Sequence, residues 1–301
     1  MSLLTRATQK LAAVQGFGTG LPQRDANRIP EELLTKLLTK SDNLPEAKRA
    51  TNAGSNMHVS SLIGVCERSA VLMRRFNDGA PVYNQVSGFD RIVWKIGRAV
   101  EAHIRDNIIR AHGPSKVLGK WTCPCGAATF EGTFPMDRPI CPVCKKERDI
   151  YQEWDLIDDE YGVQGHPDLP LIWSDGSIIV VEIKSMNAKE WKELKSPKGD
   201  HRFQACMYRR ILQRKGYRVN DKVIVIVATK DYQFTRKESP YKEYQIDATT
   251  PQLQAELDGA LVLAGRVRDA VANETLPHRT CANPQLSTAK SCSQCVRCFN
   301  L

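Results

Sequence analysis

The sequence predicts a three-layer α/β domain, in which helices cover both faces of a small sheet. Two continuous apolar runs, "SIIVVEIKS" at 177–185 and "DKVIVIVAT" at 221–229, are typical of strands that are buried on both faces. Longer segments with the apolar spacing of amphipathic helices lie before, between and after these runs. Such interleaving of helices with a few buried strands indicates the α/β class.

Length and charge limit the classes of protein that fit. The chain has 301 residues, 42% of them hydrophobic, which suffices for one large domain with additions. The sequence contains neither an apolar run of the roughly 18 to 20 residues that span a membrane nor a secretory signal, so we expect a cytoplasmic protein. The formal charge of +9 favours a polyanionic partner such as nucleic acid, although basic proteins without such a partner are common.

The first half of the chain predicts an arm followed by two helices. Residues 1–56 are polar, with scattered Pro, Gly and Asn, and we expect them to form a flexible N-terminal arm. A helix follows Ser60 or Ser61, and a longer one fills 89–112 until Gly113 ends it. The second helix is expected to bury one apolar stripe, formed by Ile92, Ile96, Val100, His103 or Ile104, and Ile108.

The second half supplies the sheet and its cover. Residues 119–150 break the periodicity and form an expected insertion. A strand pair within 163–185 follows, then a helix at 201–217, the strand at 221–229 and a long helix at 252–273. The tail from Pro277 is expected to be a loop that carries cysteines.

Three charges, Asp168, Glu182 and Lys184, lie in or beside the first apolar run. Glu182 and Lys184 share a strand face because residues two apart point the same way. A two-residue loop at 175–176 would place Asp168 across from Ile183. A three-residue loop at 174–176, with Gly176 in the left-handed conformation, would instead pair Asp168 with Glu182.

Two carboxylates held side by side repel each other, and burial raises the cost unless a cation lies between them. Hard oxygen ligands suit Mg²⁺ or Mn²⁺, and a neighbouring lysine can stabilise charge that develops on a phosphoryl group. The alternative for this stretch is a simple salt bridge of Lys184 with Glu182 or Asp168 on a solvated strand face.

The motifs "GHPD", "VEIKS" and "FQACMY", in this order, resemble the PD-(D/E)XK nuclease superfamily, in particular its RecB-like branch with the iron-sulfur CRISPR adaptation nucleases and phage exonucleases. The resemblance covers 57–301 and implies a restriction-endonuclease-like core, a mixed central sheet flanked by helices. Carried over residue by residue, it implies His103 of "GRAVEAHI" as a metal ligand, Asp168 of the second motif, Glu182 and Lys184 of the E-x-K motif, and the DNA-binding pair Gln204 and Tyr208.

This resemblance implies a metal-dependent DNA nuclease, an exonuclease that acts on single-stranded or free-ended DNA in phage or bacterial recombination, repair or replication. One or two Mg²⁺ or Mn²⁺ ions would be held by His103, Asp168, Glu182 and the carbonyl of Ile183, with Lys184 assisting the attacking water. Partners would be DNA and recombination or replication proteins, in a bacterial or phage-infected cell. The alternatives are a catalytically inactive nuclease-fold DNA-binding or assembly protein, and an adaptor whose zinc ribbon is the functional part.

Eight of the ten cysteines form two closely spaced groups. In a reducing compartment such spacing indicates metal more often than disulfides. The first group predicts a zinc-ribbon insertion at 119–150, against free cysteines or part of another cluster; it consists of Cys123, Cys125, Cys141 and Cys144.

The second group lies in the tail, residues 277–301, and the resemblance implies that it binds a structural [4Fe-4S] cluster together with an upstream cysteine. Thiolates also bind zinc, so a zinc site made by the tail alone, with Cys66 as a small buried apolar residue, and unligated cysteines stay open. The cluster ligands would be Cys66, Cys292 and Cys298, with either Cys281 or Cys295.

A basic segment joins the E-x-K strand to the next helix. It carries Trp191 among Lys189, Lys192, Lys195 and Lys198. We expect Lys192 and its neighbours to track phosphates while a base stacks on Trp191, against an ordinary charged loop.

Overall fold

The computed structural model describes residues 56–76, 88–127, 129–133, 140–146, 150–230 and 239–300. The expected N-terminal arm lies outside the described residues, apart from Asn56. No described helix is long and apolar enough to cross a membrane.

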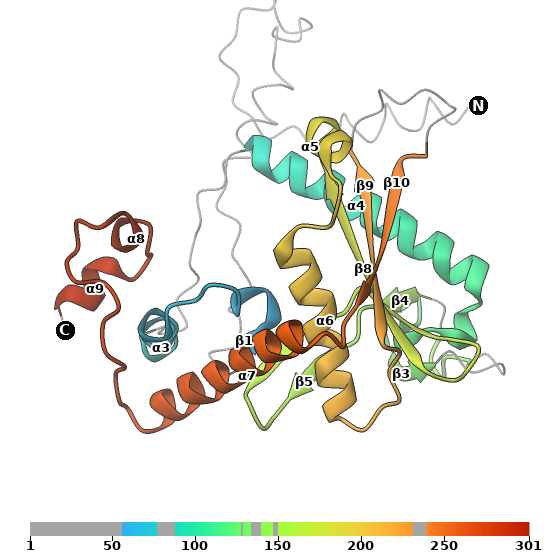
Figure 1. The fold of residues 1–301 in the computed structure, drawn as a ribbon. Helices are drawn as coiled ribbons and strands as arrows, with labels where there is room; N and C mark the ends of the chain where they lie inside the picture. The colour runs from blue at the N-terminus through green and yellow to red at the C-terminus, as the bar shows by residue number, and fades with distance from the viewer. Residues whose placement is uncertain are drawn as a thin grey trace, which may run out of the picture. The chain divides into compact units, whose positions relative to one another are not determined.

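The central sheet is mixed and has the strand order β10-β9-β8-β7 (Figure 1). β8 (Ile178–Met186) pairs in parallel with β9 (Lys222–Thr229), and β9 pairs antiparallel with β10 (Tyr241–Asp247). β7 (Leu169–Ile172) is antiparallel to β8. The two continuous apolar runs of the sequence are therefore the two inner strands, which is where strands buried on both faces belong.

The hairpin between β7 and β8 has the three-residue loop. The backbone N–H of Trp173 donates to the carbonyl of Ser177 at 2.8 Å, and Gly176 has a φ of +80°. Pairing runs from Ile172 opposite Ile178 to Leu169 opposite Val181. The expected three-residue loop is therefore confirmed; the ladder ends at Leu169, and Asp168, one residue earlier, places its carboxylate on the backbone N–H of Ile183.

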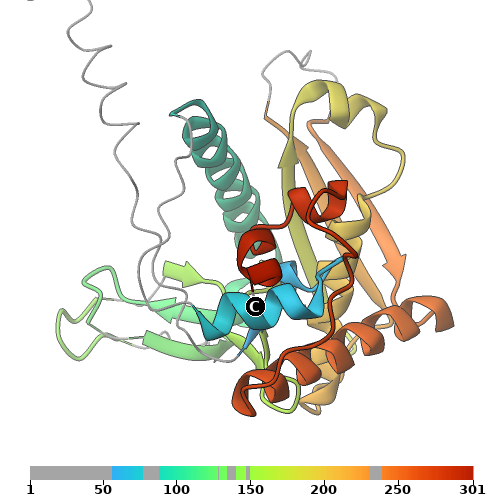
Figure 2. The ribbon, with the colours of Figure 1, turned by 90° about the vertical axis from the view of Figure 1, so that its left-hand side faces the viewer.

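Helices cover both faces of the sheet, which confirms the three-layer α/β class (Figure 2). α4 (Gly88–His112) packs Ile104 and Ile109 into a core that includes Ile179, Val181 and Ile183 of β8. The opposite face is covered by α6 (Gly199–Arg214), which packs in a second core with Val180 and Val225. α7 (Pro251–Ala272) and α3 (Glu67–Arg75) pack on each other beyond α6.

The apolar stripe expected along α4 is wrong in its first half, where Ile92 and Ile96 are exposed. Steps of four residues advance by 400°, so the stripe drifts by about 40° per step and Ile92 lies about 120° around the helix from Ile104. The helix approaches β8 closely at Gly97, where a Cβ atom would lie 3.0 Å from the Ser185 hydroxyl.

Two small sheets flank the central one. One has the order β1-β6-β5 and the other β3-β2-β4, and a bridge between Val117 and Leu171 joins the second to the edge strand β7. The remaining short elements are β1 (Met57–His58), η1 (Val59–Ser61), η2 (Pro114–Lys116), β2 (Leu118–Thr122), β3 (Thr129–Thr133), β4 (Ile150–Gln152), β5 (Leu156–Asp158), β6 (Val163–Gly165), α5 (Ala188–Glu193), α8 (Ser287–Lys290) and α9 (Cys295–Asn300).

Gly165, at the end of β6, lies where the neighbouring side chains leave no room for a Cβ atom. A Cβ atom here would lie 2.5 Å from Cε1 of Tyr208 and 3.1 Å from Cγ2 of Val59. The missing side chain lets the Tyr208 ring of α6 reach the backbone just before Asp168.

We predict that Gly165→Ala lowers the free energy of unfolding by about 1–3 kcal/mol because the added methyl displaces a packed ring. Gly259→Ala is the matched control: this glycine lies within α7 with open space at its Cβ position, so alanine should add about 0.5–1 kcal/mol. Urea denaturation of both variants measures the difference, and an undiminished Gly165→Ala stability would contradict the packing.

Candidate active site and metal centres

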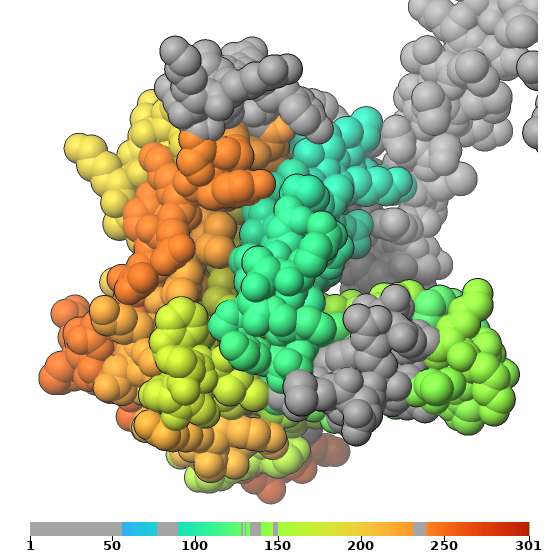
Figure 3. Space-filling view, turned by 90° about the vertical axis from the view of Figure 1, so that its right-hand side faces the viewer, coloured from blue at the N-terminus to red at the C-terminus, as the bar shows by residue number. Residues whose placement is uncertain are grey.

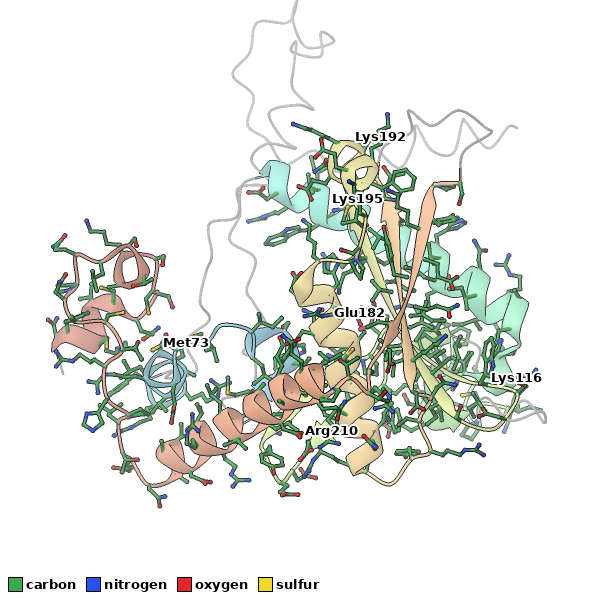
Figure 4. All side chains as sticks on the ribbon, viewed as in Figure 1. Met73, Lys116, Glu182, Lys192, Lys195 and Arg210 are labelled. Carbon is green, nitrogen blue, oxygen red and sulfur yellow. The ribbon has the colours of Figure 1, made fainter. Side chains whose placement is uncertain are left out.

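Asp168, Glu182 and Lys184 lie together at the start of β7 and along β8. One carboxylate oxygen of Asp168, Oδ2, accepts a hydrogen bond from the backbone N–H of Ile183 at 2.7 Å. Glu182 is 2% exposed and lies deep in the fold (Figure 4); its Oε1 is 2.6 Å from Lys184 Nζ. Among the described residues, nothing hydrogen-bonds the buried Oε2 of Glu182. The salt bridge between Lys184 and Glu182 that the sequence left open therefore exists. It lies on a buried face, and the second Glu182 oxygen has no hydrogen-bond partner among the described residues.

Burial sets the protonation of this group. It raises the pKa of Asp168 well above its usual range, and the nearby charge of Glu182 raises it further, against the smaller effects of Lys184 and the Ile183 N–H. Burial also raises the pKa of Glu182, partly offset by Lys184. For Lys184, burial acts to lower the pKa, but the charges of Glu182 and Asp168 outweigh it and the net shift is upward. Lys184 therefore stays an ammonium ion. Its single positive charge does not balance the two buried carboxylates, Asp168 and Glu182.

Glu101 of α4 lies within electrostatic reach of these residues and was not among the site residues expected from the sequence. The Ser185 hydroxyl donates to Glu101 Oε1 at 3.0 Å. Burial raises the pKa of Glu101, against the Ser185 hydrogen bond and the charge of Lys184. The charge of Glu101 in turn raises the pKa of Glu182. The available signal was the spacing: Glu101 lies one helical turn after Gly97, the residue at which α4 approaches β8.

The expected role of His103 as a metal ligand is not supported by its position. His103 is exposed, and its Nε2 lies 3.0 Å from the side-chain nitrogen of Asn107. Two residues separate it from Glu101, which turns it about 200° around the helix. The structure thus brings together Asp168, Glu182 and Lys184 of the expected set, and on α4 the residue within electrostatic reach of Glu182 is Glu101.

The donors that meet here suit a hard divalent cation. Asp168 and Glu182 supply oxygen atoms, and one of these oxygens, Glu182 Oε2, is buried without a hydrogen-bond partner among the described residues; Glu101 adds a third negative charge nearby on α4. The carbonyl of Ile183, expected as a further ligand, belongs to the residue whose N–H holds Asp168. The donor set thus fits Mg²⁺ or Mn²⁺.

One tyrosine and one arginine support the site. Tyr151 donates its hydroxyl proton to the backbone carbonyls of Asp168, at 3.1 Å, and Leu118, at 3.2 Å. The guanidinium of Arg105 lies 5.5 Å from the Tyr151 ring centre, and it pairs with Glu153 at 2.7 Å. These contacts fix the backbone that carries Asp168.

The face of α6 with the expected pair Gln204 and Tyr208 lies beside the carboxylates. Tyr208 is buried, and burial raises its pKa, with further increases from the charges of Glu182 and Asp168. Gln204 is half-buried one turn earlier. His201, a turn before Gln204, has a pKa lowered by burial and by the charge of Lys184, despite the opposing effect of Asp200.

Trp191 is not placed for base stacking. Its ring is 8% exposed, its indole N–H donates to the Val227 carbonyl at 3.0 Å, and Lys242 Nζ covers it at 4.5 Å from the ring centre. The indole instead completes the core at the end of β9. Lys192 and Lys195 are exposed around α5, as Figure 4 shows.

The first cysteine group forms a tight cluster. The sulfur of Cys123 lies 3.3 Å from that of Cys125 and 3.1 Å from that of Cys144, and Cys125 lies 3.7 Å from Cys141. A tetrahedral zinc with sulfurs at about 2.3 Å needs sulfur–sulfur separations of about 3.8 Å, so a small adjustment accommodates the ion. Hydrogen bonds from the N–H groups of Cys144 and Val143 help to lower the pKa of Cys141 to about 6, which favours the thiolate. The expected ribbon-like insertion is therefore present between β2 and β4.

The second group lines one cavity of about 450 Å³ between the start of α3 and the tail. Cys66 caps α3 and faces the tail, so it is not a small apolar residue in the core. The buried Arg68 donates from Nε to the Cys298 sulfur at 3.2 Å and from Nη1 to the Pro277 carbonyl at 2.8 Å. The cavity is lined by all five candidate ligands, Cys66, Cys281, Cys292, Cys295 and Cys298.

No protein-family model and no curated protein matches the sequence. Two solved structures are similar to it at 14% identity. The crystal structure of SSO0001 covers 88% of this chain and 95% of its own, with a TM-score of 0.37. The crystal structure of LHK-Exo in complex with dAMP covers 75% of this chain and 94% of its own, with a TM-score of 0.42. The site described above rests on the chain's own residues.

We predict that Glu101→Gln weakens Mn²⁺ binding by about 10- to 100-fold, because it removes a negative charge that acts on Glu182. The matched change on the same helix, His103→Asn, should leave Mn²⁺ affinity within about threefold of the unaltered protein, since its side chain is exposed and points elsewhere. Electron paramagnetic resonance titration with Mn²⁺ measures both. The reverse pattern would restore His103 as the ligand.

Proposed function

We propose that this protein is a metal-dependent DNA nuclease with Asp168, Glu182, Lys184 and Glu101 at its active site. The single observation that carries the proposal is the buried pair Asp168 and Glu182, with Lys184 on one Glu182 oxygen and the other oxygen unpartnered among the described residues. Burying several carboxylates against a single ammonium is costly, and a divalent cation relieves that cost. The same constellation is what the motif resemblance implies, apart from His103.

The chemistry divides between ion and protein. A bound Mg²⁺ or Mn²⁺ supplies a Lewis acid and lowers the pKa of bound water. Lys184, whose pKa is raised, serves as a fixed positive charge for the phosphoryl oxygens rather than as a base. Ile183 and Tyr151 hold Asp168 through its carboxylate and its carbonyl, which keeps the site preorganised.

The proposed substrate is DNA that is single-stranded or has a free end, and the proposed mode is exonucleolytic. The net charge of +9 and the exposed lysines around α5 suit a phosphate backbone. The motif resemblance supports phage or bacterial recombination, repair or replication in the cytoplasm, with proteins of those processes as partners. The proposed nuclease domain spans 57–301, preceded by an arm at 1–56.

Two further metal groups belong to the proposal. Zinc fits the four thiols at 123–144, which all lie within 4.8 Å of one another. A [4Fe-4S] cluster fits the 450 Å³ cavity, where the five sulfurs contact hydroxyls, carbonyls or Arg68. Four of the five would bind it: Cys66, Cys292 and Cys298, with Cys281 or Cys295. Its role would be structural, because it would join α3 to the tail.

We predict that Lys184→Ala lowers Mn²⁺- or Mg²⁺-dependent cleavage of end-labelled DNA at least about 100-fold, because the transition-state charge loses its ammonium partner. Lys222→Ala, at the exposed start of the neighbouring strand β9, should cleave normally. Uncut DNA under every condition, or equal cutting by Lys184→Ala, would contradict the nuclease assignment and favour an inactive DNA-binding protein.

Metal analysis of anaerobically purified protein tests the two cysteine groups separately. Cys144→Ser should lose zinc and retain iron, whereas Cys298→Ser should lose iron and its visible absorbance while retaining zinc, because the two groups are independent sites. Cys206→Ser, a buried cysteine outside both groups, should retain both metals. Zinc in both groups, or iron that survives in Cys298→Ser, would contradict the assignment.

A further inference from the structure

Trp94 is a large aromatic side chain for which the proposed active site gives no role. It is 51% exposed on α4. Seven residues separate it from Glu101, so the two side chains lie within about 20° of the same helix face and about 10 Å apart along the axis. Trp94 therefore lies two turns from Glu101, on the same face of α4.

Positive charge occupies the interval between Trp94 and the carboxylates. Arg98 is exposed one turn after Trp94 and one turn before Glu101. Lys230 reaches α4 at Gly97, where its Nζ lies 3.2 Å from the position that a Cβ atom of this residue would occupy. Asp90 lies one turn before Trp94, at the start of the helix and outside this interval. The path from Trp94 to Glu101 is thus lined by cations.

The rest of α4 does not extend an apolar patch around Trp94. The exposed Ile92 and Ile96 each lie about 160° around the helix from it. A protein partner would need a larger apolar surface on one face. A lone exposed indole among cations is instead the arrangement that binds a base by stacking and its phosphates by charge.

Figure 2 shows how the two sides of this region are arranged. The first turns of α4 diverge from the end of β8 and from α5, which carries the exposed Lys192 and is followed by the exposed Lys195. Figure 3 shows the other side of α4, which lies alongside β9 and β10 on the surface. The face with Glu101 and Trp94 is therefore the one turned toward the strand that holds Glu182.

We infer that Trp94 is a stacking platform for an unpaired base of a DNA strand that leads to the carboxylates. The inference rests on the proposed nuclease function and names its strand-binding subsite. At about 3.4 Å per stacked nucleotide, 10 Å places this base roughly three nucleotides from the phosphate that is cut. Trp94 thereby fills the role that the buried Trp191 cannot.

The test is equilibrium binding of a fluorescein-labelled single-stranded oligothymidine without added divalent cation. Trp94→Ala should weaken binding about tenfold, and Trp94→Phe should stay within about threefold of the unaltered protein. Trp173→Ala is the matched control, because Trp173 is 46% exposed in the β7–β8 loop and should not affect binding. Thermal melts confirm that the variants are folded.

A second set of oligonucleotides separates stacking from structure. In this set, one nucleotide of the oligonucleotide is replaced by an abasic site, at a different position in each member. The unaltered protein should bind one member more weakly than the rest, and Trp94→Ala should bind that member as well as it binds the others. Equal binding by Trp94→Ala, abasic penalties that persist unchanged in Trp94→Ala, or no binding by any form would overturn the inference.

The same samples decide the nuclease function independently. Metal-dependent cleavage with Trp94-independent binding would leave the nuclease assignment and remove the subsite. Trp94-dependent, base-sensitive binding without cleavage would retain the subsite and remove the nuclease assignment.

Discussion

The register of the β7–β8 hairpin, which brings Asp168 to the backbone of Ile183 beside Glu182, is the constraint on which the site depends. A slip of one residue would turn Asp168 to the other face of the sheet. Gly176, at a φ of +80°, permits the three-residue loop that sets the register, and the Ile183 N–H then fixes the Asp168 carboxylate. The Asp168 carboxylate is thereby held close to the buried Glu182.

Close backbone approach is what brings the surrounding elements to this pair. Gly97 lets α4 reach β8, and Glu101 follows one turn later with its hydrogen bond from Ser185. On the opposite layer, Gly165 leaves room for the Tyr208 ring beside the backbone that precedes Asp168. Two glycines thus let two helices pack closely around these charges, and burial raises the pKa values of Asp168, Glu182 and Glu101.

The two cysteine groups are brought together in different ways, one by residues close in the sequence and the other by tertiary packing. Cys123 and Cys144 lie near each other in the sequence, and their sulfurs are 3.1 Å apart. Cys66 and Cys298 are separated by most of the domain and meet because α3 packs on α7 and α9. Arg68 strengthens this contact by holding both Cys298 and the Pro277 carbonyl.

The sequence by itself determined the α/β class, the two inner strands, the charged trio and both cysteine groups, because apolar period, strand alternation and short spacings are local properties. Only the tertiary structure decided that Glu101 rather than His103 faces the trio, that Trp191 is core rather than surface, and that Cys66 meets the tail. The first depends on rotation of about 200° around α4, and the others on which surfaces neighbouring elements cover. A sequence pattern specifies a face, whereas packing decides what that face meets.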